Sequence, residues 1–138
     1  MWSRIALAGL VAASLGCSPA GDSATGFPQT PYAHVDCVGG GCSIDVRTSP
    51  QPPRVGVNSL QLTIRGRDGE MLDGLTLEVT PTMAAHGHGA SVHPTVTPRG
   101  GGIYVVDDVS TYMAGTWELH TTLRGAATDE ATIVLDVR

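Results

Sequence analysis

The stretch that decides the fold is residues 117–124, WELHTTLR. Its odd-numbered positions hold Trp117, Leu119, Thr121 and Leu123, and its even-numbered positions hold polar or charged side chains. Successive side chains of a β-strand point to opposite faces, so this period of two predicts one buried face and one solvated face. We therefore interpret the stretch as a half-buried β-strand.

The same alternation recurs along the chain, in residues 60–64, 75–80 and 133–137. Shorter candidate strands cover residues 43–48, 92–97 and 103–106. Turn sequences rich in Gly separate these segments, and no segment has a helical stripe. About seven short strands in about 95 residues predict an all-β fold, an immunoglobulin-like β-sandwich.

The composition limits the class of protein. The chain has 138 residues, enough for one domain, and a formal net charge of −5; its eight basic residues are all arginine. An acidic chain without a basic cluster lacks the electrostatic footprint of a nucleic-acid-binding protein, so we expect no nucleic-acid partner. Aromatic residues are scarce, which leaves Tyr104, Tyr112 and Trp117 as the large core candidates.

Residues 1–16 are typical of an export signal peptide. Arg4 supplies a positive start, and residues 5–15 are apolar or small throughout. This run has the length of a signal-peptide core and is too short to span a bilayer. Residues 14–17 (SLGC) resemble the lipobox of bacterial lipoproteins, although Ser14 stands where Leu is usual. The resemblance implies cleavage before Cys17 and lipidation of Cys17; the alternative is an ordinary cleaved signal peptide.

Lipidation of Cys17 implies a location in the cell envelope. Several acyl chains anchor a protein stably, because each buried methylene contributes about 0.8 kcal/mol. Ser18 does not resemble the Asp that retains lipoproteins at the inner membrane, which favours the outer membrane. We expect the membrane to be a partner through the N-terminal lipid, with the domain in the periplasm or at the cell surface.

Residues 18–35 are rich in Ser, Pro, Ala, Gly and Thr, and we predict a flexible tether there. Cys37 and Cys42 follow, and with Cys17 lipidated they are the remaining thiols of an exported chain. We predict a disulfide between them; the alternatives are a thiolate metal site and an unpaired, reactive pair. The predicted organisation is a signal peptide at 1–16, the lipidated Cys and tether with the Cys pair at 17–42, and the sandwich domain at 43–138.

Four stretches resemble the YtkA-like family of small exported bacterial domains. They are similar to its opening strand, first hairpin, Met/His-rich loop and closing motif, at residues 53–62 (PRVGVNSLQL), 68–69 with 72–75, 81–94 (PTMAAHGHGASVHP) and 102–104 with 113–119. The last two also match the family in order and spacing. One departure is Ala84, which stands where a Pro commonly follows the Met. The resemblance implies an immunoglobulin-like sandwich and an association with copper handling or respiratory-oxidase assembly.

The strongest candidates for chemistry lie around residues 81–94. His86 and His88 are two residues apart, so in extended backbone their side chains point to one side and are able to meet at one ion. Imidazole with thioether is a ligand set that suits copper, and the thioether favours the cuprous state, whereas zinc would need a further hard or thiolate ligand. We predict a copper ion as cofactor, with a ligand pool of Met83, His86, His88, His93 and Met113.

A second interpretation makes the same loop structural. The imidazoles would then bond to nearby carbonyls, and the thioethers would fill the end of the core, as Met often does. The sandwich would act as a structural or protein-interaction module for another envelope protein. His34 and His120 are not assigned to the site, because the first lies in the tether and the second on the wet face of its strand. No nucleophile elbow, phosphate-binding loop or His-Glu-x-x-His pair is present, so we predict no enzyme.

Overall fold

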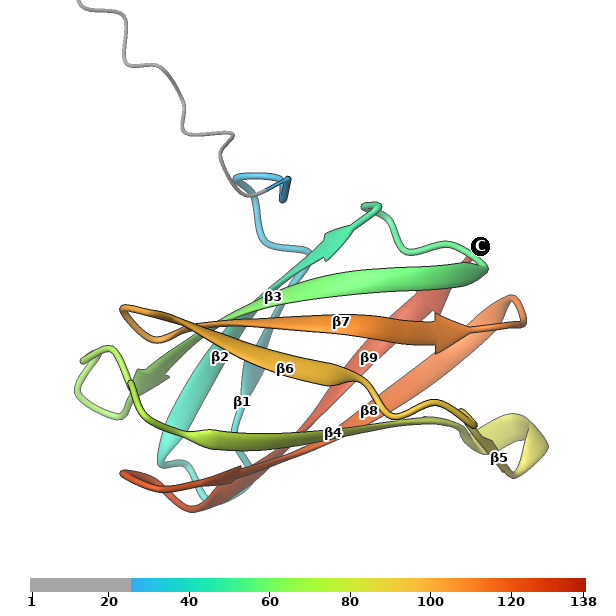
Figure 1. Ribbon diagram of the computed structural model, residues 1–138. Coiled ribbons are helices and arrows are strands. Elements are labelled where there is room, and N and C mark those ends of the chain that lie inside the picture. The colour runs from blue at the N-terminus through green and yellow to red at the C-terminus, as the bar shows by residue number, and fades with distance from the viewer. Residues whose placement is uncertain (1–25) are drawn as a thin grey trace, which may run out of the picture.

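Two antiparallel sheets face each other in the computed structural model, which describes residues 26–138 (Figure 1). The five-stranded sheet has the order β1-β2-β3-β7-β6, and the four-stranded sheet has the order β5-β4-β8-β9. The predicted fold class, an all-β immunoglobulin-like sandwich, is confirmed. The predicted signal peptide, the predicted lipidation site Cys17 and the first part of the tether lie outside the described residues.

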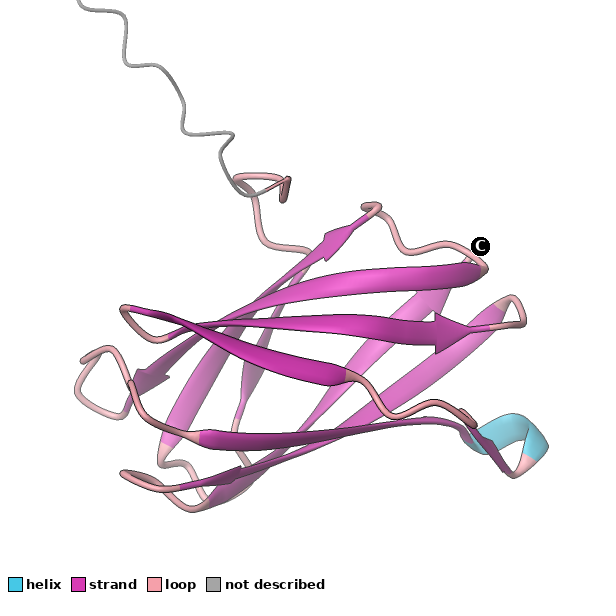
Figure 2. Cartoon of the chain, in the orientation of Figure 1, coloured by secondary structure: helices cyan, strands magenta, loops and turns pink. Residues whose placement is uncertain are grey.

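The strands follow the alternating segments of the sequence. The five-stranded sheet is built from β1 (Ala33–Asp36), β2 (Cys42–Ser49), β3 (Gly56–Gly66), β6 (Thr95–Gly100) and β7 (Ile103–Thr111). The four-stranded sheet is built from β4 (Thr76–Met83), β5 (His88–Gly89), β8 (Gly115–Arg124) and β9 (Asp129–Val137). One short 3₁₀ segment, η1 (Ala84–His86), joins β4 to β5 (Figure 2). Within residues 26–138, the structure contains no helix with the length and apolar character that a membrane crossing requires.

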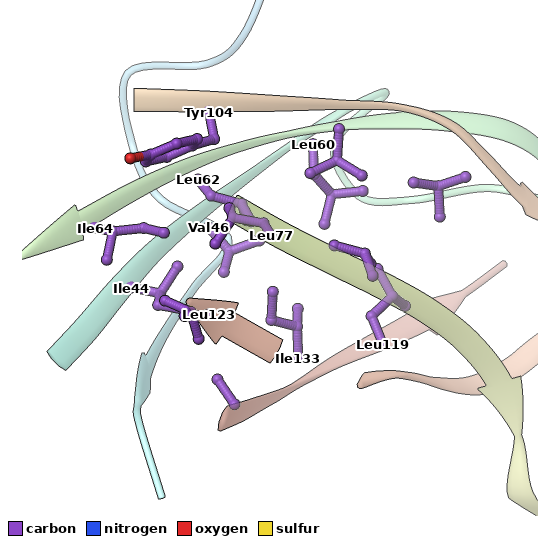
Figure 3. Packing of buried hydrophobic residues seen from close by; sticks show 14 of the residues in the cluster. Ile44, Val46, Leu60, Leu62, Ile64, Leu77, Tyr104, Leu119, Leu123 and Ile133 are labelled. Carbon is purple, nitrogen blue, oxygen red and sulfur yellow. The ribbon is translucent and has the colours of Figure 1, made fainter. Parts of the chain in front are cut away.

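The core lies between the two sheets. Trp117, Leu119, Thr121 and Leu123 of β8 are buried, and the side chains at the even-numbered positions between them are half-buried or exposed. From the other sheet, Ile44 and Val46 of β2 point into the same layer, and Figure 3 shows them together with Leu119 and Leu123 in the packed core. Burial of one such side chain stabilises the fold by about 1.5–3 kcal/mol, so the alternation read from the sequence is also the main source of stability.

The folded domain begins earlier than the sequence pattern indicates. We predicted a flexible tether at residues 18–35 and the start of the domain at residue 43, but β1 pairs with β2 over Ala33–Asp36. Val35 packs against the core, and Cys37 and Cys42 are part of it. The predicted tether is therefore wrong for residues 33–35, and the domain begins before residue 43. The alternation of Ala33-His34-Val35-Asp36 covers only four residues, too few to stand out from a Pro- and Gly-rich segment.

Two smaller predictions also need correction. The strand expected at residues 92–97 lies at Thr95–Gly100, and it includes Pro98, which an edge strand tolerates because one row of its backbone donors has no partner strand. Tyr112, expected in the core, is 45% exposed, because it follows the last residue of β7 and lies in the turn to β8. Tyr104 and Trp117 are buried, as expected.

Candidate functional site

The predicted Met/His loop, residues 81–94, lies at the end of the sandwich where β4 stops (Figure 1). After Met83 the chain makes the single turn η1, and Gly87 reverses it in the left-handed conformation, with a φ of 64°. Glycine adopts this conformation without a steric penalty. The chain then returns as β5 against the end of β4, and the Ala90 N–H donates to the carbonyl of Pro81 at 3.1 Å. The loop is thus a hairpin held to the sheet by backbone pairing.

Met83 connects this loop to the neighbouring β7–β8 turn. It is 3% exposed, and its Cα is the register partner of the Cα of His88. A Cβ placed on Gly115 would lie 2.6 Å from the Met83 methyl carbon, so the thioether packs directly against the start of β8. Gly115 has a φ of 131°, which L side chains rarely adopt. A glycine there gives Met83 its space.

Met113 lies in that β7–β8 turn, two residues before Gly115. Its carbonyl accepts the indole N–H of the buried Trp117 at 2.9 Å, and Tyr112 stacks edge-on against the same indole with ring centroids 5.1 Å apart. The Met113 side chain is 37% exposed. The turn is therefore fixed by the core while the thioether of Met113 remains accessible at the surface.

The structure distributes the three predicted histidine ligands over this end of the molecule. His86 closes η1 and is exposed, and His93 is exposed in the connection that leads to β6. The backbone of His88 pairs with Met83, but its side chain is not among those described. The structure thus brings the Met83 and Met113 segments together. The convergence of the imidazoles on one ion stays a prediction.

The other two described histidines lie away from this loop. His34 is on β1, where its Nδ1 lies 2.7 Å from a carboxylate oxygen of Asp45 on β2. His120 is exposed on β8, with its Nε2 3.5 Å from the Glu118 carboxylate. Both are on strand surfaces, and neither belongs to residues 81–94.

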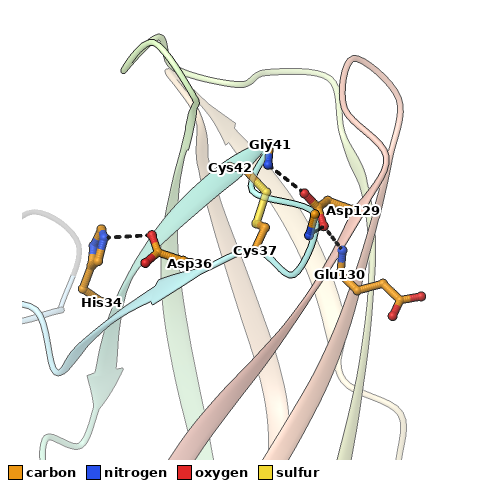
Figure 4. Close-up of a disulfide and its surroundings, with 8 residues drawn as sticks. His34, Asp36, Cys37, Gly41, Cys42, Asp129 and Glu130 are labelled. Carbon is orange, nitrogen blue, oxygen red and sulfur yellow. Dashed lines mark hydrogen bonds and ion pairs between the residues drawn. A yellow bond between two sulfur atoms is a disulfide. The ribbon is translucent and has the colours of Figure 1, made fainter.

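A second constellation, at the opposite end of the sandwich, escaped the sequence analysis. The structure joins Cys37 and Cys42 by a disulfide, and the carboxylate of Asp129, at the start of β9, faces it (Figure 4). Asp129 accepts the N–H of Gly39 at 2.7 Å and that of Gly41 at 3.0 Å. Among the side chains that the structure describes, Cys37, Cys42 and Asp129 form the one group of three His, Cys, Asp or Glu residues whose ligand atoms all lie within 4.8 Å of one another.

The glycines between the two cysteines have separate physical roles. Gly40 has a φ of 69° and makes the turn. A Cβ on Gly39 or Gly41 would lie 3.0 or 3.1 Å from the Asp129 carboxylate, so these two positions leave room for the carboxylate. The backbone hydrogen bond from Gly39, followed by those from Glu130 and Gly41, holds the pKa of Asp129 below its usual range. Asp129 is about ninety residues away in the sequence, so no local pattern could predict this contact.

The largest hollow described does not coincide with either constellation. It has a volume of about 580 Å³ and lies on the outer face of the five-stranded sheet. Phe27, Ser59, Arg99, Ile103 and Asp107 are among its lining residues. The Ser59 hydroxyl donates to the Asp107 carboxylate at 2.7 Å, which fixes one wall. None of the described candidate ligands lines this pocket.

Comparisons with known proteins give one match. The model of a family described as YtkA-like matches residues 41–122, which is more than half of the chain. No curated protein matches the chain. No solved structure matches it either. The matched segment runs from Gly41, just before the second cysteine of the disulfide, to Thr122 near the end of β8, and it includes the whole Met/His loop.

Proposed function

The chain belongs to the YtkA-like family, and from that premise we propose that its domain is a non-enzymatic module that binds one copper ion at the Met/His loop. The ion is cuprous, because thioether ligands favour the softer oxidation state. Its ligands come from Met83, His86, His88, His93 and Met113, and not all of them bind at once. The module works in the cell envelope, attached to a membrane through the lipid on Cys17.

The observation that carries the proposal is the packing of Met83 against Gly115. This contact brings the hairpin that carries the histidines against the turn that carries Met113. Both thioethers and the backbone of His88 then belong to one end of the sandwich, although residues 83 and 113 are thirty positions apart in the sequence. A soft ion bound there would draw ligands from two elements that are already held together.

Two observations support the proposed location. The first is the sequence of residues 1–16, which is typical of an export signal peptide, together with the resemblance of residues 14–17 to a lipobox. The second is the disulfide between Cys37 and Cys42, since such bonds persist in oxidising compartments and are rare in the cytosol. A module held on the membrane surface would keep a bound copper ion in the envelope.

The direct test is titration of the purified protein with cuprous ion under reducing conditions, against a chromophoric competitor. We expect one ion per chain at the loop, and the double variant His86→Ala/His88→Ala should lose at least about tenfold in affinity. Binding should also weaken in acid, because protons compete with the ion for imidazole. The matched control is His34→Ala/His120→Ala, which removes the two histidines outside the loop and should bind like the parent protein.

The copper proposal is abandoned if the parent protein takes up no cuprous ion, or if the two double variants bind it equally well. The second outcome would show that uptake does not depend specifically on His86 and His88, and it would leave residues 81–94 a structural loop.

A second function is favoured by the apolar side chains around the same end. Val57 on β3 is 66% exposed and pairs with Ser110 on β7. The chain continues from β7 into the exposed Tyr112 and Met113. Such side chains suit a contact with another envelope protein. The test is to purify the membrane-attached protein and its Val57→Ser/Tyr112→Ser variant and to compare the proteins that co-purify. An interaction module predicts a stable complex with the unaltered chain and none with the variant, whether or not copper is present.

A further inference from the structure

We propose that Cys37, Cys42 and Asp129 form a second, redox-gated site, which binds a thiophilic cation such as zinc when the disulfide is reduced. The site does not depend on the copper proposal, because it uses none of the same residues. The observation that supports this site is the triad of ligand atoms in the described residues: two sulfurs and a carboxylate oxygen lie within 4.8 Å of one another. In the disulfide form the sulfurs are bonded to each other, and the site is closed.

Hydrogen bonds hold the loop of the two cysteines in addition to the bond between their sulfurs. The N–H of Cys37 donates to the carbonyl of Cys42 at 2.9 Å, and the N–H of Gly40 donates to the carbonyl of Cys37 at 2.9 Å. The N–H of Val38 donates to the carbonyl of Glu130 at 2.7 Å, which ties the loop to β9. With the two bonds to Asp129, five hydrogen bonds hold the loop, so we expect both thiols to stay beside the carboxylate after reduction.

Opening the site is a two-electron step. A dithiol reductant supplies two electrons and two protons, the bond between the sulfurs of Cys37 and Cys42 breaks, and the reductant becomes a disulfide. The cation then replaces the two thiol protons, which are released to solvent. A cation is needed for this exchange because two thiolates next to the Asp129 carboxylate would otherwise repel one another.

The geometry fits a tetrahedral centre with one open position. Zinc bonds to thiolate at about 2.3 Å and to carboxylate at about 2.0–2.2 Å, which separates neighbouring ligand atoms by about 3.5–3.8 Å. After reduction the two sulfurs must move apart by about 2 Å to reach this separation, and the carboxylate oxygen, which lies within 4.8 Å of both, must approach them by about 1 Å. A hollow of about 350 Å³ lies next to the site and shares Asp129 with it; Val38 and Glu130 also line this hollow.

This site is spatially independent of the Met/His loop. Asp129 pairs with Leu123 near the end of β8, whereas Met83 contacts Gly115 at its beginning. A ten-residue strand spans about 30 Å, so binding at one end is measurable without interference from the other.

The experiment uses the full chain with Cys17→Ser, which removes the third thiol of the sequence. One sample is reduced with a phosphine that is then removed, and a second is left oxidised. Cobalt(II), a spectroscopic substitute for zinc, is titrated into both under anaerobic conditions. We expect the reduced chain to bind one equivalent with a thiolate-to-metal charge-transfer band, and the oxidised chain to show no such band.

Three variants separate the triad from other metal binding. Cys37→Ser/Cys42→Ser should abolish the charge-transfer band. Asp129→Asn keeps one acceptor oxygen, which serves either the N–H of Gly39 or that of Gly41 but not both, and it should weaken binding by about tenfold or more, because the charged ligand is gone. The matched control Glu130→Gln, the next residue along β9, should bind like the parent, and His86→Ala/His88→Ala should keep the band unchanged.

Two results would overturn the proposal: a reduced chain whose cobalt spectrum equals that of the Cys37→Ser/Cys42→Ser variant, or an Asp129→Asn affinity equal to that of Glu130→Gln. Circular dichroism of each reduced variant is recorded alongside. A reduced parent chain that loses its β-sheet signal would also overturn the proposal, since the site requires a folded loop.

Discussion

At the scale of single residues, the hydroxyl of Tyr104 shows how a polar atom organises the core. The Tyr104 Oη donates to the carbonyl of Leu72 at 2.7 Å and accepts the N–H of Leu75 at 3.0 Å. These two residues belong to the connection from β3 to β4, where the chain crosses from one sheet to the other. The phenol of β7 thus pins the crossover from inside, and it satisfies two buried backbone groups at once.

Tyr104→Phe should therefore destabilise the domain by about 1–3 kcal/mol, because a buried N–H and a buried carbonyl lose their partner while the ring stays. Urea denaturation followed by circular dichroism measures the change. Tyr112→Phe is the matched control: its ring packs on Trp117, but it is exposed, and we expect a change within about 0.5 kcal/mol. Equal effects of the two substitutions would show that the crossover does not depend on the Tyr104 hydroxyl.

At the scale of the strands, Asp45 links β1, β2 and β3, three neighbouring strands of the five-stranded sheet. Its carboxylate lies on β2, within 2.7 Å of the His34 imidazole on β1 and within 2.7 Å of the Arg65 guanidinium on β3. The hydrogen bond with His34, and then the contact with Arg65, hold the pKa of Asp45 below its ordinary value of 3.8 against the opposing effect of burial. Since β1 is an edge strand, this carboxylate helps to keep it in the sheet.

The lowered pKa makes a prediction about acid stability. A carboxyl whose folded pKa is depressed stabilises the fold fully above its unfolded pKa and loses that contribution as pH falls through the folded value. Asp45→Asn should cost about 1 kcal/mol at about pH 5, and the difference from the parent should shrink below about pH 4. Urea titrations at a series of acid pH values measure it. Asp36→Asn, an exposed carboxylate on the same strand pair, should show a smaller and flatter difference, and the reverse order would contradict this account.

A strand could be predicted where its own sequence alternates between apolar and polar residues over enough positions. Segments such as residues 60–64 and 117–124 are long enough for a period of two to be read, and they lie within β3 and β8. β1 and β5 have four and two residues, and their pairing is decided by β2 and β4 rather than by their own sequence. Tyr112 was misplaced because a turn residue after an alternating strand has no fixed face.

At the scale of the whole molecule, residues 33–42 join the beginning of the domain to its last strand. β1 and the disulfide loop lie against the last strand, since the Val38 N–H donates to the Glu130 carbonyl and Asp129 binds the loop from β9. The first and last strands of the sandwich are therefore neighbours, and residues 33–42 belong to the cooperative unit.

Truncation tests this boundary. A chain that starts at Gly26 should unfold in one cooperative transition, whereas a chain that starts at Ser43 should be less stable by about 3–5 kcal/mol, because it loses the partly buried Val35, the buried Cys37 and the disulfide. Thermal and urea unfolding of the two chains measure the difference. The boundary at residue 33 is wrong if the shorter chain is as stable as the longer one.

The two candidate metal sites differ in how far the sequence could reveal them. The Met/His loop is local, so its residue types and spacing were visible, but the direction of each imidazole depends on the turn at Gly87 and on β5. The triad combines Cys37 and Cys42, near the beginning of the domain's sequence, with Asp129, near its end. Only the packing of β9 against the loop brings them together in space. Sequence reasoning found the cysteines and missed the carboxylate.

The environment of Trp117 gives the molecule a built-in optical probe. It is the only tryptophan in residues 26–138, it is fully buried, and its indole N–H is bonded to the carbonyl of Met113. The indole emission of the domain therefore originates at the end of the sandwich that carries the Met/His loop. Events at that end should be observable by fluorescence without a label, whereas chemistry at the disulfide, which lies toward the other end of the sandwich, should change the emission much less.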